Sequence, residues 1–162
     1  MEVAAVVITF LGHRSLHNRN DLFEWVKKAI LEKGDFSNDV VFFCGGYGDF
    51  DDLCAQVCRS IKESGQNCEI VFVTPYITVA QQEKIKWWME LGLYDSVLYP
   101  PLEQVPLKFA IGKRNEWMID QSDLIIAYVE HSFGGAYQSL NYAQRKGKRI
   151  VNLACEKNPS KK

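Results

Sequence analysis

Short apolar runs alternate with longer amphipathic stretches along the whole chain. The apolar runs are rich in β-branched and aromatic residues and are continuous rather than alternating, which is typical of strands covered on both faces. They lie at 3–11, 40–44, 69–73, 96–99, 124–129 and 149–153. Helical patterns separate them, at 21–33, 51–64, 78–91, 107–121 and 135–146. This order predicts a single α/β domain with a doubly wound, mostly parallel sheet and helices on both faces.

The expected helices carry start and stop signals. Asp21 with Glu24, and Thr78 with Gln81, have the spacing of capping boxes. A glycine follows the end of each of four helices, where a left-handed residue is favoured. These glycines are Gly34, Gly65, Gly92 and Gly147. We expect the domain to span residues 1–155, followed by a polar C-terminal tail at 156–162.

Composition narrows the class of protein. The chain has 162 residues, with 19 Lys and Arg against 20 Asp and Glu, so its net charge is −1. Domains that coat nucleic acid usually carry a basic excess, so this balance argues against nucleic acid as a partner. The apolar stretch at 3–11 is far below the ~20 residues of a spanning helix, and no basic segment precedes it as in a signal peptide. We therefore expect a cytoplasmic protein without a membrane partner.

The five cysteines and three histidines do not predict a metal site. An odd number of cysteines without a secretion signal indicates free thiols in a reducing compartment. Cys54 and Cys58 share an apolar helical stripe with Val57 and Ile61, so we expect them to be buried. The histidines are not spaced as ligands. We expect no metal and no cofactor.

Candidate chemistry follows the strands, because ligands of open parallel sheets bind beyond the carboxyl ends of the strands. Three loops stand there: 12–15, 45–52 and 130–137. Two of them hold paired glycines directly before a helix. Such glycines let the backbone approach a ligand, and the helix N-terminus offers free N–H groups to a phosphate; the alternative for each loop is a tight turn. The candidate ligand-binding residues in these loops are Gly12, His13, Arg14, Gly45, Gly46, Tyr47, Asp51, Gly134 and Gly135.

Named phosphate-binding motifs are absent. No GxGxxG follows the first strand, and Gly112-Lys113 lacks the upstream glycine of a P-loop. A standard dinucleotide dehydrogenase and a P-loop ATPase are therefore disfavoured.

Arg114 is the charged member of an otherwise apolar stripe with Leu107, Ile111 and Met118. A buried guanidinium needs an anionic partner. One interpretation is a salt bridge to Asp51 or Asp123. The other is a fork for a ligand phosphate or carboxylate, with Asn115 and Lys113 beside it.

Several other side chains have two interpretations. Asp49, Asp51 and Asp52 could cap a helix or bind ribose hydroxyls. The histidines His13 and His131 could act as acid or base groups. The aromatic residues beside the glycines that could stack on a base are Tyr47, Phe133 and Tyr137. The pair Trp87-Trp88 is a candidate for the core or for a homodimer contact.

These pieces together resemble the SLOG superfamily, which contains the DprA/Smf proteins and the Lonely-guy phosphoribohydrolases. The matching pieces are the Gly-His-Arg start in Val7–Arg14, GGYGDFD at Gly45–Asp51, and the string from Lys113 to Lys148 that opens with KRNEWMIDQSDLIIAYV. The likeness covers about residues 5–153 and is greatest to small, uncharacterised YpsA-like bacterial members. It implies a Rossmann-like fold and a nucleotide or nucleotide-derived ligand at the glycine loops, with Arg114 near a phosphate.

The resemblance leaves enzyme activity open. At the position of the Lonely-guy catalytic acid this chain has Asn141, whose amide cannot act as a general base. We therefore favour a nucleotide-binding module with a role such as sensing. The alternative is an N-glycosidic hydrolase or transferase acting on nucleoside 5′-monophosphates. Its candidate catalytic residues are Arg114, Asp51 and Glu116.

Overall fold

The computed structural model describes residues 5–17 and 21–157. Its strands are Val6–Gly12 (β1), Val40–Cys44 (β2), Cys68–Val73 (β3), Ser96–Leu98 (β4), Leu124–Tyr128 (β5) and Arg149–Asn152 (β6). Its helices are Leu22–Lys33 (α1), Asp49–Glu63 (α2), Val79–Glu90 (α3), the short 3₁₀ helix Leu107–Phe109 (η1), Ala110–Gln121 (α4), Gly135–Arg145 (α5) and Leu153–Lys157 (α6).

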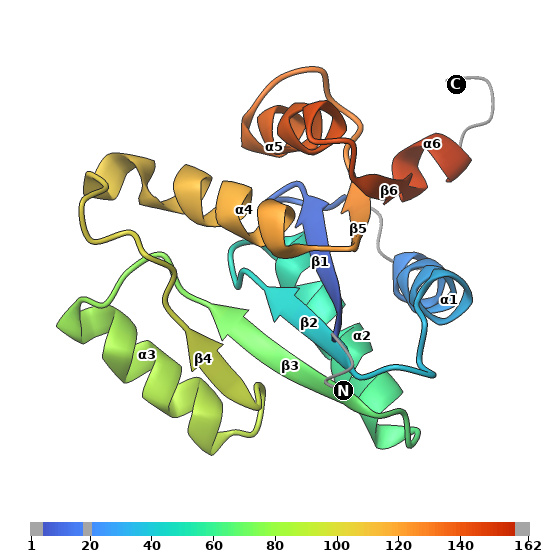
Figure 1. Ribbon diagram of the computed structural model, residues 1–162, viewed down its shortest axis with the longest axis horizontal. Helices are drawn as coiled ribbons and strands as arrows, with labels where there is room; N and C mark the ends of the chain where they lie inside the picture. The colour runs from blue at the N-terminus through green and yellow to red at the C-terminus, as the bar shows by residue number, and fades with distance from the viewer. Residues whose placement is uncertain (1–4, 18–20, 158–162) are drawn as a thin grey trace.

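The strands form one parallel sheet in the order β4-β3-β2-β1-β5-β6 (Figure 1). The chain moves outward from β1 to β4, then returns to the other side of β1 to place β5 and β6. The order therefore reverses between β1 and β5, where a doubly wound sheet has its ligand-binding crevice. The predicted α/β, doubly wound fold is confirmed.

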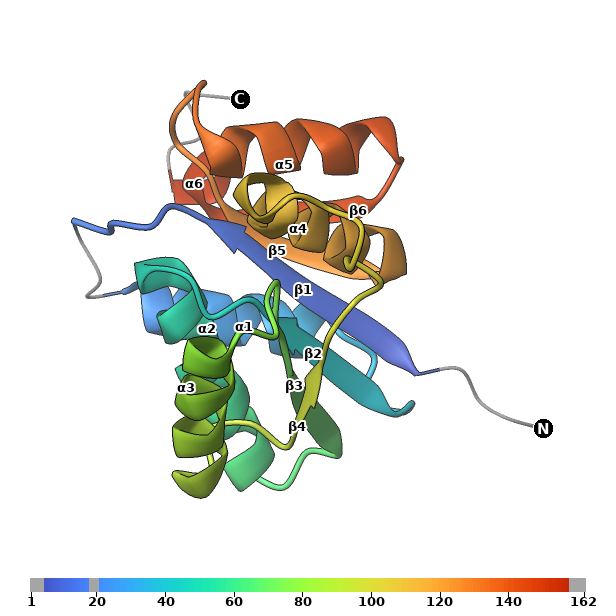
Figure 2. The ribbon, with the colours of Figure 1, turned by 90° about the vertical axis from the view of Figure 1, so that its left-hand side faces the viewer.

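Helices cover both faces of the sheet (Figure 2). The larger apolar cluster joins the strands to α1, α2 and α3, with Phe42 and Phe72 at its centre. On the opposite face α5 and Ile119 of α4 pack on β5, and Met118 of α4 packs on β2 and β3. This arrangement brings the starts of α2 and α5 to the carboxyl edge of the sheet, one from each face.

Most element boundaries agree with the sequence expectations. Thr78 caps α3 by accepting a hydrogen bond from the Gln81 N–H, whereas Asp21 makes no side-chain cap of α1. Three of the four predicted left-handed glycines have positive φ: Gly65, Gly92 and Gly147. The prediction was wrong for Gly34, which is extended with φ −76° and ends α1 by donating its N–H to the Ile30 carbonyl without a left-handed residue. The expected helix at 107–121 is divided into η1 and α4.

The C-terminal part of the chain differs from the expectation. The expected strand at 149–153 ends at Asn152, and α6 follows at once. The Asn152 Oδ1 accepts hydrogen bonds from the N–H groups of Val129 and Ala154, which ties the start of α6 to the end of β5. Helix α6 enters the predicted tail, of which residues 158–162 lie outside the described part of the chain.

The cysteines are free thiols, and Cys44, Cys54, Cys58 and Cys68 are buried. Burial raises the pKa of Cys54 and Cys58, which keeps these thiols protonated. Within residues 5–17 and 21–157, no helix has both the length and the apolarity that crossing a bilayer would require.

Candidate functional site

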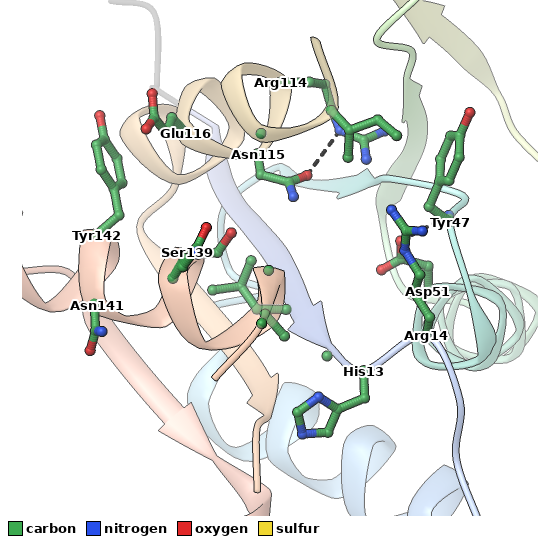
Figure 3. A pocket seen from close by; sticks show the side chains of 18 of the residues that line it. His13, Arg14, Tyr47, Asp51, Arg114, Asn115, Glu116, Ser139, Asn141 and Tyr142 are labelled. Atoms are coloured by element: carbon green, nitrogen blue, oxygen red, sulfur yellow. Dashed lines mark hydrogen bonds between the residues drawn. The ribbon is translucent and has the colours of Figure 1, made fainter. Parts of the chain in front are cut away.

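A cleft of about 780 Å³ opens at the carboxyl edge of the sheet. The loops after β1, β2 and β5 form one side, and α4 and α5 form the other (Figure 3). Of the predicted site residues, it brings together Gly12, His13, Arg14, Tyr47, Asp51, Arg114, Asn115, Glu116, Gly134 and Gly135. Gly45 and Gly46 do not line it, nor do Asp49, Asp52 and Tyr137. Segments more than 100 residues apart in sequence thus meet at one place.

The glycines after β2 serve the packing of the chain itself. A Cβ on Gly45 would lie 3.1 Å from the Asp51 Oδ2 and 3.2 Å from the Arg114 Nη2. Gly46 has φ +68°, and its Cβ would lie 2.4 Å from the Phe72 ring. Within the chain, therefore, the tight-turn interpretation accounts for this loop.

Arg114 fastens two strand ends. Its side chain is only 1% exposed, and Nη1 donates to the carbonyls of Gly45 at 2.7 Å and Val73 at 2.9 Å. Its Nε donates to the Asn115 Oδ1, and its guanidinium lies 5.6 Å from the centre of the Tyr47 ring. Burial lowers the pKa of Arg114 and the charge of Asp51 opposes this, so the group stays a cation.

The two acids suggested as partners of Arg114 are far apart in the fold. Asp123 lies at the amino edge of the sheet, where it accepts a hydrogen bond from the Val7 N–H. The interpretation of Asp123 as a salt-bridge partner of Arg114 was therefore wrong. Asp51 lies at the cleft, and its Oδ2 accepts a hydrogen bond from the Tyr47 N–H at 2.9 Å.

Asp51 has an unusual protonation equilibrium. Burial raises its pKa to about 6, against the opposing effects of the Arg114 charge and the Tyr47 N–H. A carboxyl group with this pKa exchanges protons near neutral pH, which suits an acid or base group. Figure 3 shows Arg14 reaching across the same side of the cleft, next to Asp51 and Tyr47.

The glycines before α5 are in a different situation. Gly134 has φ +88° and is the N-cap residue of α5, and Gly135 is the first residue of that helix. A Cβ on either residue would meet nothing within 4 Å, and both are exposed to the cleft. The first turn of α5 has no acidic residue, whereas that of α2 has Asp49, Asp51 and Asp52. Of these two helix starts, α5 is the one that favours an anion.

Two histidines join the loops after β1 and β5. The His13 Nε2 accepts a hydrogen bond from the Glu130 N–H at 2.8 Å, so this nitrogen is unprotonated. The rings of His13 and His131 are 4.5 Å apart, and Phe133 stacks on His131 at 5.1 Å. Burial lowers the pKa of His13, and the nearby His131 lowers it further. His13 therefore acts here as a neutral acceptor that holds the two loops together.

Sequence reasoning missed most of the helical wall of the cleft. The missed residues are Lys108, Ile111, Gly112, Gln138, Ser139, Tyr142 and Arg145, with Asn141 considered only through the resemblance. Residues 108, 112, 115 and 116 lie on one helical face, but this spacing alone does not indicate that α5 lies opposite it. Within the described ranges, no three His, Cys, Asp or Glu side chains are placed to hold a metal ion.

Solved structures supply the comparison. DprA from Streptococcus pneumoniae superposes with a TM-score of 0.61 at 18% identity, over 90% of this chain and 49% of that one. This chain has a DprA-like Rossmann fold. DprA from Helicobacter pylori gives a TM-score of 0.58 at 16% identity, over 90% of this chain and 63% of that one. The Chlamydomonas rheinhardtii Moco carrier protein gives a TM-score of 0.52 at 12% identity, over 94% of this chain and 77% of that one. No family model and no curated protein matches the sequence.

The comparison supports the SLOG resemblance at the level of the fold, while the closeness to YpsA-like members stays a prediction. It also corrects one expectation. The H. pylori DprA, which superposes on this chain, is a protein with a single-stranded DNA binding mode. The net charge of −1 was therefore wrongly taken as an argument against nucleic acid as a partner. This chain spans 49% and 63% of the two DprA chains.

Proposed function

We propose that the cleft binds a nucleotide or a nucleotide-derived small molecule, with a phosphate at the N-terminus of α5. Gly135 carries this proposal. It is exposed, it lines the cleft, and neither its backbone conformation nor any neighbour within 4 Å requires glycine. A ligand that approaches the backbone N–H groups of the first turn does require it.

The charges at the cleft agree with an anionic ligand. Arg14 from the β1 loop and Lys108 from η1 both line it, and both are exposed. Asp51, from the acid-rich start of α2, lies next to Arg14 (Figure 3), so the α5 start is the better position for a phosphate.

An aromatic surface is available for the base. Phe133 is 72% exposed, although it stacks with one face on His131. An exposed aromatic ring at the mouth of a polar cleft is a suitable stacking partner for a nucleobase.

We assign the protein to the cytoplasm, since its free thiols favour a reducing compartment. We suggest that ligand binding there serves sensing.

Titration tests the proposal. We expect at least one member of a panel of nucleoside mono- and diphosphates, cyclic nucleotides and ADP-ribose derivatives to bind in calorimetry. Gly135→Asp places a carboxylate at the proposed phosphate position, so we expect affinity to fall by at least about ten-fold. The same change stabilises an α-helix by about 0.3–1 kcal/mol, so lost binding would not come from unfolding.

A matched control exists on α3. Val79 is the first residue of that helix, is 74% exposed, and also begins a first turn without acidic residues. Val79→Asp should leave ligand affinity unchanged. If the wild-type protein binds no member of the panel, or if Gly135→Asp and wild type bind with equal affinity, the proposal is wrong.

The raised pKa of Asp51 favours a second candidate function, cleavage of the N-glycosidic bond of a nucleoside 5′-monophosphate. Asp51 lines the cleft and would be the acid or base group. Release of free base, measured by chromatography, should then be lost in Asp51→Asn. If the wild-type protein binds nucleotides without releasing base, the chain is a binding module.

A further inference from the structure

The cleft continues from the sheet edge into the groove between α4 and α5. Each helix contributes residues spaced three or four apart, which lie on one helical face. They are Gly112, Asn115 and Glu116 from α4, and Gly135, Ser139 and Tyr142 from α5. The part of the groove beyond Gly135 has no assigned occupant in the function proposed above.

Gly112 has no structural reason to be glycine. It lies inside α4, its φ is outside the left-handed region, and a Cβ there would meet nothing within 4 Å. Glycine weakens a helix interior relative to alanine. The missing side chain leaves room directly at the cleft, which Gly112 lines.

The groove also holds hydrogen-bonding groups that the chain does not use. The Asn115 Oδ1 accepts from Arg114, which leaves its Nδ2 as a donor. Among residues 5–17 and 21–157, the Ser139 hydroxyl has no hydrogen-bond partner. Figure 3 shows Asn115 and Ser139 facing the same space from the two helices. Glu116 adds a carboxylate that lines the cleft and pairs with Lys113 at 3.2 Å.

We propose that this groove binds the vicinal hydroxyl groups of the ligand's sugar, with Gly112 as the opening through which the sugar reaches them. The inference rests on the proposed function. A second phosphate would be repelled by Glu116, and an ammonium group would meet the Asn115 amide donor. A diol both donates and accepts at neighbouring atoms, so it satisfies an amide N–H, a hydroxyl and a carboxylate together.

The spacing fits a pentose 5-phosphate. Gly135 and Ser139 are four residues apart on α5, which is about 6 Å along a helix axis. The phosphorus and the 3′-oxygen of a nucleoside 5′-phosphate are separated by five single bonds, and an extended chain of that kind spans about 6 Å. A phosphate at the α5 start therefore places the ribose hydroxyls beside Ser139.

Removing hydroxyl groups from both partners tests the contact. The probes are the tightest-binding of AMP, GMP, CMP and UMP and its 2′,3′-dideoxy analogue, measured by calorimetry with wild type and Ser139→Ala. We expect Ser139→Ala to weaken the ribonucleotide by about three- to ten-fold and to leave the dideoxy nucleotide unchanged. Gln144→Ala, an exposed position of α5 outside this cleft, should change neither affinity.

Gly112→Ala adds a second, independent readout. We expect it to weaken the ribonucleotide by at least about five-fold while the thermal midpoint rises, because alanine is the better helix former. Equal affinities of wild type for the two probes, or equal weakening of both by Ser139→Ala, would overturn the sugar assignment and leave the proposed function intact. If no nucleotide binds, both proposals fall together.

Discussion

Replacing Arg114 with methionine separates the two interpretations of this residue. Methionine keeps much of the length and apolar stem but removes all donors. The carbonyls of Gly45 and Val73, which Arg114 holds at 2.7 and 2.9 Å, would then be buried without these donors. Each unsatisfied buried group costs about 1–3 kcal/mol, so we expect Arg114→Met to lower the free energy of unfolding by about 2–6 kcal/mol.

Equilibrium unfolding in urea measures this loss. With a denaturant slope of about 2 kcal/mol/M, the midpoint should fall by about 1–3 M. Lys113→Met is the control, since Lys113 is exposed and pairs with Glu116 on the surface, where such pairs contribute about 0.2–1 kcal/mol. If Arg114→Met lowers the free energy of unfolding by less than about 1 kcal/mol and also lowers ligand affinity, Arg114 does not serve mainly to hold the ends of β2 and β3 together. Arg114 would then be a ligand-binding group.

Two further predictions concern the protonation of Asp51 and the two tryptophans. Folded Asp51 keeps its proton up to about pH 6 rather than the ordinary 3.8, so the free energy of unfolding should fall by about 3 kcal/mol as pH rises through that window. Asp51→Asn should remove this fall in urea unfolding at pH 4 to 7; an unchanged slope would contradict it. Trp88→Ala should lower the free energy of unfolding by about 3–5 kcal/mol, because the Trp88 ring packs on the Phe72 ring with their centres 5.1 Å apart. Trp87→Ala should lower it little, because Trp87 is 60% exposed. If Trp87 forms a homodimer contact, sedimentation should show Trp87→Ala shifting the protein to monomer.

The strands could be predicted from sequence because each is a continuous apolar run flanked by turn residues. The place of the cleft could also be predicted, since parallel strands bring Gly12, Asp51 and Gly134 to one edge. The helical wall could not, because Gly112 and Ser139 belong to ordinary amphipathic helices. Their joint position depends on how α4 and α5 pack, which no local pattern encodes.

The two glycine pairs show a different limit. In sequence they look equivalent, since each follows a strand and precedes a helix. In the fold, Gly45 and Gly46 are required by Arg114, Asp51 and Phe72, whereas Gly135 has open space. Neighbours distant in sequence decide this difference, so a motif alone cannot separate a packing glycine from a ligand-facing one.

Net charge fails as a guide to partners for a related physical reason. It sums charges over the whole surface, while a ligand meets only the field of one cleft, because exposed charges beyond about 10 Å are screened. Here the acids at the start of α2 offset Arg14 and Lys108 in the sum, yet of these acids only Asp51 lines the cleft, and the start of α5 has no acid in its first turn. A total of −1 is therefore compatible with a strongly anion-binding end. At the proposed phosphate position the relevant charge is that around Gly135, so Gly135→Asp, which changes the total by only one unit, should weaken binding by at least about ten-fold while Val79→Asp leaves it unchanged.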